Sequence, residues 1–181
     1  HERLVGSEMC IRDSHMLIRR VWQMPNSRTF SIKPIRELIQ KYANGYTIDP
    51  FAAGNRLANV TNDIDPQYDT DFHMDATDFL NLFKPDSVDT VLYDPPYSPR
   101  QVAECYKALG ITVNMQTTQA YTEAGEEAIG RIVKKGGIVI TCGWNSGGIG
   151  KKYGFEIIEI LLVAHGGWHN DTIVTVEKKV L

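Results

Sequence analysis

Apolar and polar positions follow a helical period early in the chain. Between residues 35 and 42, apolar side chains recur at intervals of three and four residues, which places them on one face of a helix. Ser31 has the side chain of an N-cap, Pro34 suits the first helical turn, and Gly45 can end a helix. The pattern predicts a helix that begins after Ser31 and ends before Gly45.

The rest of the chain alternates between short apolar runs and longer mixed segments. The apolar runs predict strands at 46–49, 59–63, 71–74, 88–94, 138–142, 155–164 and 171–177. The mixed segments predict helices at 75–83, 100–109 and 120–133, with polar residues 114–119 between the last two and a turn at 135–137. Strands that alternate with helices and end in a strand pair predict an open α/β sheet, mostly parallel with an antiparallel C-terminal strand.

The bulk composition is that of one globular domain. The chain has 181 residues, of which 43% are hydrophobic and 23% charged, and this suits a single core. No apolar run is long enough to cross a membrane, so we expect a cytoplasmic protein with no membrane partner. Cys10, Cys105 and Cys142 are odd in number and widely spaced, so we expect neither a disulfide framework nor a metal site.

The formal net charge of −3 bears on possible partners. Proteins that bind nucleic acid on their own are usually basic, because contacts to phosphates supply most of the non-specific affinity. If this chain acts on nucleic acid, we expect its own binding to be weak. A separate specificity subunit or a homodimer would then supply the rest.

Residues 1–14 show neither a helical nor a strand period. They are similar to peptides that arise when sequencing-adapter DNA is translated, and we expect them to be a non-native leader. A single domain over residues 15–181 then carries the function.

The most specific motif is Asp94-Pro95-Pro96-Tyr97, which follows the apolar run 88–93. Two consecutive prolines lack amide hydrogens and restrict the residue before them, so a strand has to stop here. The segment presents a carboxylate, main-chain carbonyls on a rigid stretch and an aromatic ring. These groups can hold an exocyclic amine while its nitrogen attacks a carbon atom.

This tetrapeptide resembles the Asp/Asn/Ser-Pro-Pro-Tyr/Phe/Trp signature of amino-methyltransferases that use S-adenosylmethionine. The resemblance implies a Rossmann-like class I methyltransferase sheet with S-adenosylmethionine as cofactor. In that chemistry Asp94 and the carbonyl of Pro95 accept the two amine hydrogens, which directs the nitrogen lone pair at the methyl group. Pro96 keeps the segment rigid, and Tyr97 stacks on a base that has left the helix. Aspartate at the first position is typical of adenine-N6 enzymes.

Residues 46–55 resemble the cofactor loop of DNA amino-methyltransferases. Asp49, Pro50 and Phe51 match the family's Asp-Pro-Phe, while Ala53 and Asn55 stand where the family has glycine. Glycine matters there because the backbone must approach the cofactor closely. The resemblance assigns Asp49, Pro50, Phe51 and Ala53 to cofactor binding, and the two departures put the affinity in doubt.

Three further segments match the family by their order along the chain. Asp63 or Asp65 lies where the family has an acidic residue that binds the cofactor's ribose. Asp75 and Ala76 resemble the loop at the adenine ring. Residues 26–34, with Ser31 and Lys33, resemble the segment that closes over the methionine end, although helix capping would explain Ser31 equally well.

Four residues at predicted strand exits or helix starts are candidates for substrate contact: Arg100, Trp144, Trp168 and His169. In an open α/β sheet, ligands bind outside the carboxyl ends of the strands. Trp168 is more often a packed ring than a platform for a base, and Arg100 could equally be solvated.

The sequence predicts a compact methyltransferase that acts on adenine N6 in DNA. One alternative is the same chemistry on an RNA base, at adenine N6 or guanine N2. Another is a non-catalytic, methyltransferase-like subunit of a partner complex, because Ala53 and Asn55 depart from the family's cofactor loop.

Overall fold

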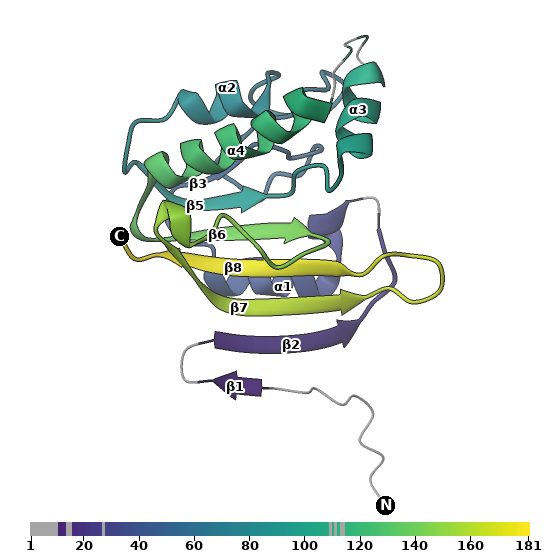
Figure 1. The fold of residues 1–181 in the computed structure, drawn as a ribbon, viewed down its shortest axis with the longest axis vertical. Helices are drawn as coiled ribbons and strands as arrows, with labels where there is room; N and C mark the ends of the chain where they lie inside the picture. Colours follow the sequence, from purple (N-terminus) through teal and green to yellow (C-terminus); the bar gives the residue numbers. More distant parts are fainter. Residues whose placement is uncertain (1–10, 14–15, 27, 109, 111, 113–114) are drawn as a thin grey trace, which may run out of the picture.

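The structure is a computed structural model, and it describes residues 11–13, 16–26, 28–108, 110, 112 and 115–181. Its centre is one sheet in the order β1-β2-β7-β8-β6-β5-β3-β4 (Figure 1). The strands are β1 (Ile11–Asp13), β2 (Met16–Trp22), β3 (Thr47–Asp49), β4 (Val60–Thr61), β5 (Val88–Tyr93), β6 (Val133–Gly143), β7 (Phe155–Ala164) and β8 (Thr172–Lys179).

Most neighbouring strands pair in parallel. The exceptions are β1, which is antiparallel to β2, and β8, which is antiparallel to both β6 and β7. The expected sheet, mostly parallel with an antiparallel C-terminal strand, is therefore confirmed. Residues 11–13 of the expected leader form β1, while residues 1–10 and 14 lie outside the described residues. The interpretation of 1–14 as a leader stays a prediction.

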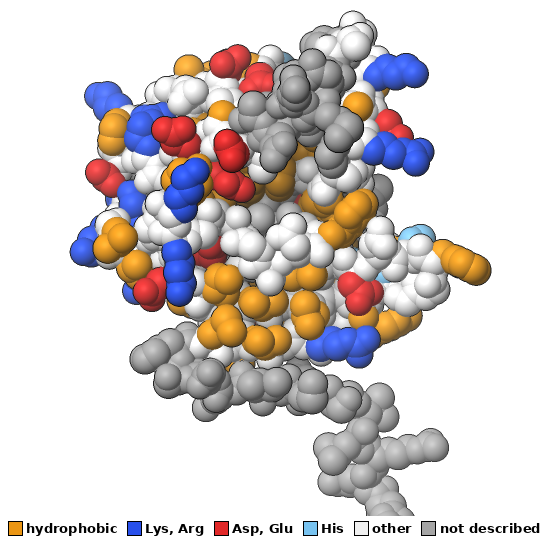
Figure 2. Space-filling view, in the orientation of Figure 1, with side chains coloured by type: hydrophobic (Ala, Val, Ile, Leu, Met, Phe, Trp, Pro, Cys, Tyr) orange, Lys and Arg blue, Asp and Glu red, His pale blue; other side chains and the backbone are white. Residues whose placement is uncertain are grey.

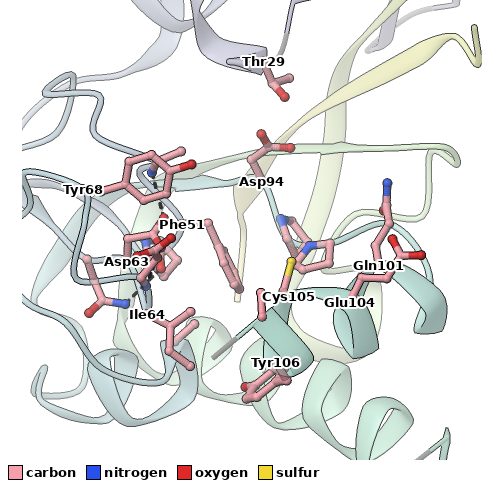
Figure 3. Close-up of a pocket in the computed structure, with 18 of the residues that line it drawn as sticks. Thr29, Phe51, Asp63, Ile64, Tyr68, Asp94, Gln101, Glu104, Cys105 and Tyr106 are labelled. Atoms are coloured by element: carbon pink, nitrogen blue, oxygen red, sulfur yellow. Dashed lines mark hydrogen bonds between the residues drawn. The ribbon is translucent and has the colours of Figure 1, made fainter. Parts of the chain in front are cut away.

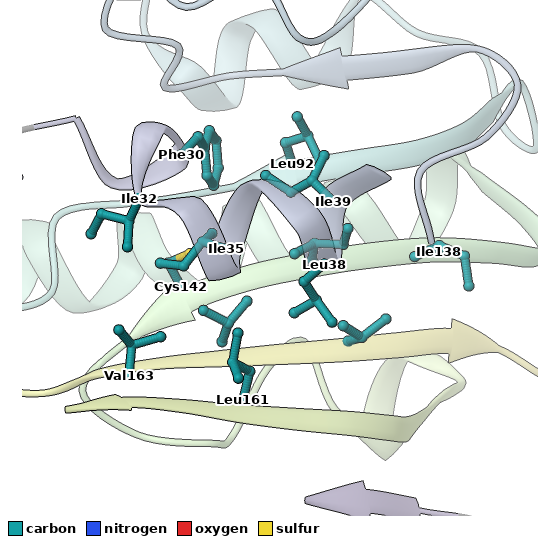
Figure 4. Packing of buried hydrophobic residues seen from close by; sticks show 13 residues of the cluster. Phe30, Ile32, Ile35, Leu38, Ile39, Leu92, Ile138, Cys142, Leu161 and Val163 are labelled. Atoms are coloured by element: carbon teal, nitrogen blue, oxygen red, sulfur yellow. The ribbon is translucent and has the colours of Figure 1, made fainter. Parts of the chain in front are cut away.

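Helices cover both faces of the sheet. The first face carries η1 (Thr29–Ser31) and α1 (Lys33–Tyr42), whose buried side chains pack against β6, β7 and β8 (Figure 4). The second face carries α2 (Ala76–Asn81) and α4 (Met115–Ile132), which pack over β3, β5 and β6. The short helix η2 (Lys151–Tyr153) precedes β7, and α3 (Pro99–Ala108) follows the Pro-Pro segment.

β5 shows why the central strands read as continuous apolar runs. Leu92 packs in the cluster under α1, whereas Val91 and Tyr93 pack in the cluster under α4. A parallel strand covered on both faces has no polar side to show. Because β5 lies between β6 and β3 in the sheet, its carboxyl end, and so Asp94, lies well inside the carboxyl edge of the sheet.

Four sequence expectations need correction. Residues 71–74 form no strand, because only an isolated bridge joins Phe72 to Asn62. α4 begins at Met115, so residues 115–119 belong to that helix. β6 begins at Val133 and passes through 135–137, where Gly136 with φ +84° allows an irregular register against β5 in place of a turn. The helix cap is discussed with the site.

No element was predicted for residues 16–22, which form β2 and extend the sheet beside β7. Its Arg19 donates to Glu159 of β7, with 2.6 Å between Nε and Oε1. Lys41 and Tyr42 of α1 donate to the other oxygen of Glu159 at 2.6 Å each. Burial opposes ionisation of Glu159, but these hydrogen bonds outweigh it and lower its pKa. One buried carboxylate thus ties together β2, β7 and α1.

Part of the second face stays open beyond α4. Ile160 and Leu162 of β7 alternate with Leu161 and Val163, which pack under α1. Figure 2 shows hydrophobic side chains gathered on this face over β7 and β8. None of the described helices is both long enough and apolar enough to span a membrane.

Candidate active site

A cavity of about 570 Å³ lies at the carboxyl edge of the sheet (Figure 3). Its walls come from the segments that follow β3, β4 and β5 and from α3. This is the edge at which open α/β sheets bind ligands, because parallel strands bring their carboxyl ends together there. The described residues hold no group of three or more His, Cys, Asp or Glu side chains that could bind a metal ion.

The Pro-Pro segment forms one wall of the cavity. Asp94, Pro95, Pro96 and Tyr97 all line it, directly after β5 ends at Tyr93. The Tyr97 hydroxyl donates a short hydrogen bond to Oδ1 of Asp94. Burial raises the pKa of Asp94, although hydrogen bonds from Tyr97 and Thr29 oppose the rise. Asp94 is therefore a more basic carboxylate than an ordinary surface aspartate.

Tyr97 is fixed from two further directions. Its amide donates to Oε1 of Gln101 at 2.7 Å, and its ring meets that of Trp144 edge-on at 5.7 Å between centroids. Burial and the nearby Asp94 raise the pKa of Tyr97, so the hydroxyl keeps its proton and acts as the donor.

Asp49 ends β3, has no exposed surface and is not among the residues that line the cavity. Its carboxylate accepts from the Phe51 amide at 2.9 Å and from the Asn55 side chain at 3.0 Å. Burial raises the pKa of Asp49 to about 7, against the effect of these two hydrogen bonds. Asp49 therefore shapes the loop, and Pro50 and Phe51 are the residues that reach the cavity wall.

The departures from the family's glycines have a structural explanation. Ala53 takes up a left-handed conformation with φ +45°, as a glycine would, and its amide donates to Oδ2 of Asp63 at 2.9 Å. Asn55 donates to Asp49 and also to the carbonyl of Ala52 at 2.7 Å. The two hydrogen bonds of the Asn55 side chain thus hold the loop in its conformation, at a position where the family has a flexible glycine.

Asp63 and Asp65 both line the cavity and are linked to each other. Oδ1 of Asp63 accepts from the amide of Asp65 at 2.9 Å, and burial raises the pKa of Asp63. Asn62, just before them, is buried and bonds the carbonyl of Pro50 at 3.1 Å and both backbone groups of Met74. This amide joins the loops after β3 and β4 into one wall.

Asp75 and Ala76 have separate places. Ala76 is buried and lines the cavity beside Met74. Asp75 is not among the lining residues, because it caps α2 through the Thr77 amide at 2.8 Å and accepts from the Tyr106 hydroxyl. Asp75 thus links α2 to Tyr106 of α3 and helps to position the cavity wall without lining it.

Ser31 and Lys33 lie away from the main cavity. Ser31 lines a neighbouring cavity of about 240 Å³, and its hydroxyl donates to the carbonyl of Arg28 at 2.7 Å. The N-cap of α1 is Ile32, so the expectation of a Ser31 cap is wrong: this hydroxyl bonds within η1 and makes no cap hydrogen bond. Lys33 is exposed and lines neither cavity. Thr29, between them and Asp94, lines both.

The four proposed substrate residues lie outside the main cavity. Arg100 is exposed and pairs with Glu104 at 2.8 Å. Trp144 contacts Tyr97 and is 42% exposed, while Trp168 is fully exposed. His169 lies in the same turn as Trp168 and is exposed. Of the four residues, Trp144 reaches the site through its contact with Tyr97. Arg100, Trp168 and His169 do not line the cavity.

Thr29, in the segment 26–34 assigned to the cofactor's methionine end, lines the cavity, whereas the sequence missed Asn62, Tyr68, Cys105 and Tyr106. Asn62 carried a signal, since a carboxamide at the end of a buried strand needs partners in the loops. The others come from helix α3 and from loops whose approach depends on the tertiary fold.

No model of a known protein family matches the chain, and a search of curated proteins gives no match. Solved structures do match. TrmN from Thermus thermophilus has a TM-score of 0.54 and 16% sequence identity, and the match covers 82% of this chain and 48% of TrmN. The N-methyltransferase NodS from Bradyrhizobium japonicum WM9 has a TM-score of 0.51 and 8% identity, with 82% and 93% covered.

These similarities concern the fold. The chain shares with these methyltransferases a Rossmann-like sheet, as the sequence predicts. It spans about half the length of TrmN.

Proposed function

We propose that this chain transfers a methyl group from S-adenosylmethionine to the exocyclic N6 of adenine in DNA. One observation carries the proposal: the Asp94–Tyr97 segment and the loop after Asp49 open into the same cavity. An acceptor held at Asp94 would therefore face a ligand held by that loop.

The cavity suits the cofactor in size and in lining. Its volume of 570 Å³ falls within the roughly 300–1,000 Å³ of small-molecule sites. Asp63 offers a carboxylate for the ribose hydroxyls, and Ile64, Met74 and Ala76 offer an apolar wall for the adenine ring. Phe51 lies between Asp63 and Asp94 in Figure 3, and Ala53 also lines the cavity. S-adenosylmethionine supplies an electrophilic methyl group on a sulfonium when bound.

The chain's own residues then supply positioning and charge. An exocyclic amine is a poor nucleophile, because its lone pair is delocalised into the ring. Asp94 and the carbonyl of Pro95 accept its hydrogens and turn the lone pair out of the ring plane. Since burial raises the pKa of Asp94, this carboxylate is also suited to take the proton that the methylated nitrogen releases. Tyr97 offers its ring to the base.

The state of the cofactor loop supports catalysis over a non-catalytic role. Asn55 holds Asp49 by a direct hydrogen bond, and Ala53 adopts the conformation expected of glycine. Because the chain has a net charge of −3, we further propose that a specificity subunit or a second copy strengthens its hold on DNA.

The proposal is tested by mass spectrometry of nucleosides. The chain is incubated with S-adenosylmethionine carrying a deuterated methyl group and with DNA or RNA, and the nucleic acid is then digested. We expect labelled N6-methyladenine from DNA. Labelled N6-methyladenine or N2-methylguanine from RNA alone would move the substrate to RNA. Bound cofactor without any labelled nucleoside would overturn the proposal.

A further inference from the structure

The three tryptophans of the chain share one edge of the molecule, and all are exposed. Trp22 ends β2, Trp144 follows β6, and Trp168 lies in the loop 165–171 between β7 and β8. Their exposed fractions are 64%, 42% and 102%. Tryptophan is highly buried on average. Three exposed rings at one edge therefore point to a ligand that stacks on them.

The tryptophans follow strands that lie in the stretch of the sheet from β2 to β6, and Trp144 contacts Tyr97 at the active site. From β2 to β5 the sheet order has four steps, which correspond to roughly 19 Å at the usual strand spacing. Trp22 lies against the loop 165–171, because a Cβ added to Gly166 would be 3.1 Å from its Nε1. Gly143, just before Trp144, pairs with Ile173 at the start of β8. Trp144 in turn contacts Tyr97.

The loop that carries Trp168 is firmly supported. His165 is buried, with Nδ1 2.7 Å from the carbonyl oxygen of Gln23 and Nε2 2.8 Å from the Thr172 hydroxyl. Its amide donates to Asp171 at 3.2 Å. The loop is thereby tied to the end of β2 and the start of β8, and it projects beyond the strand ends in Figure 1. These bonds fix the two ends of the loop, and the Trp168 ring between them is fully exposed to a ligand.

We propose that this row, Trp22, Trp168, Trp144 and Tyr97, is a stacking track for a single-stranded nucleic acid whose target base enters the cavity. The inference rests on the proposed function and names its substrate class. In a duplex the base faces are already stacked, so only an open strand can offer them to several rings. Stacking also suits a chain of net charge −3, because it depends less on phosphate contacts.

A protein partner is the other class of ligand that uses exposed tryptophans. The row's continuity with Asp94 favours nucleic acid, because the nucleotides that flank a target base must lie beside the cavity mouth. Trp144 serves both the row and the site through its contact with Tyr97.

Fluorescence anisotropy tests the proposal with four labelled probes of the same adenine-containing sequence: single-stranded DNA, single-stranded RNA and the corresponding duplexes. We expect both single strands to bind more tightly than their duplexes, and the tighter one identifies the sugar. Trp168→Ala and Trp22→Ala should each weaken binding by about 5- to 150-fold, the factor that one stacked base contributes. Tyr46→Ala is the control, since Tyr46 is 40% exposed but precedes β3 at the opposite edge.

Two results would overturn the track. Duplexes could bind as well as single strands, or Trp168→Ala and Trp22→Ala could bind like Tyr46→Ala. In the second case these tryptophans would take no part in binding nucleic acid. Calorimetry with S-adenosylhomocysteine and nucleoside mass spectrometry on the same samples keep the two proposals apart: labelled N6-methyladenine with no loss in the tryptophan variants would reject the track and leave the proposed reaction intact.

Discussion

Replacing Asp49 by asparagine should change how the stability of this protein depends on pH. Asp49 is fully buried at the end of β3, and burial raises its pKa from 3.8 to about 7. Asparagine keeps an oxygen that can accept from the Phe51 amide, but its NH2 group cannot accept from Asn55, and it cannot ionise. The lost hydrogen bond lowers stability by a similar amount at every pH, so only the lost titration changes how stability varies with pH.

The sign follows from proton binding. Between pH 3.8 and about 7 the folded state holds a proton on Asp49 that the unfolded chain has released. The folded state binds more protons in that window, so its stability falls as the pH rises through it. At about 1.4 kcal/mol per pH unit, the ionised carboxylate costs roughly 4 kcal/mol above pH 7. From about pH 5 upward, roughly 3 kcal/mol of that loss remains to be seen.

Urea unfolding followed by circular dichroism measures this loss between about pH 5 and about pH 8. Other buried acids, such as Asp94 and Glu177, have raised pKa values in both proteins, so the difference between wild type and Asp49→Asn isolates Asp49. We expect the variant to gain about 3 kcal/mol on the wild type across the range. Parallel curves for the two proteins would refute the reasoning.

Three further changes test other parts of the account. Tyr97→Phe removes a hydrogen bond that lowers the pKa of Asp94, so the acidic limb of the pH–rate profile should move to higher pH, and an unmoved limb would contradict the contact. Asn55→Ala removes one hydrogen-bond donor from the Asp49 carboxylate. Urea unfolding should show that the free energy of unfolding falls by about 1–3 kcal/mol at about pH 8 and by less at about pH 5. Equal losses at both pH values would argue against an ionised Asp49. Glu159→Ala breaks the buried ion pairs with Arg19 and Lys41. The free energy of unfolding, measured with denaturant at neutral pH, should fall by about 3 kcal/mol. A fall below about 1 kcal/mol would show that Glu159 does not hold β2 in place.

The fold could be predicted from the sequence where the signals are local. Pro34 and the apolar spacing at 35–42 predict α1, and the apolar run at 88–93 predicts β5. β2 could not be predicted, because its place beside β7 depends on a partner 140 positions along the chain, where Arg19 meets Glu159. The strand propensity of residues 16–22 says nothing about a partner so far along the chain.

The site divides in the same way. The Asp94–Tyr97 segment and the loop after Asp49 are contiguous motifs, and both were placed at the cavity from sequence. Thr29 was placed at the site only as one member of the segment 26–34, because its approach to Asp94 depends on how η1 packs over the sheet. Lys33 was assigned by its neighbourhood in the chain, and the first turn of α1 holds it in solvent.

The most direct test of the account is methyl transfer by wild type and Asp94→Ala at saturating S-adenosylmethionine. The acceptor is a single-stranded oligonucleotide that contains adenine, and calorimetry measures cofactor affinity for both proteins. The account predicts labelled N6-methyladenine from the wild type and a rate about 10²–10³ lower for the variant, with nearly equal cofactor affinity, because Asp94 faces the acceptor. Equal transfer rates for the two proteins would contradict the assignment of this site.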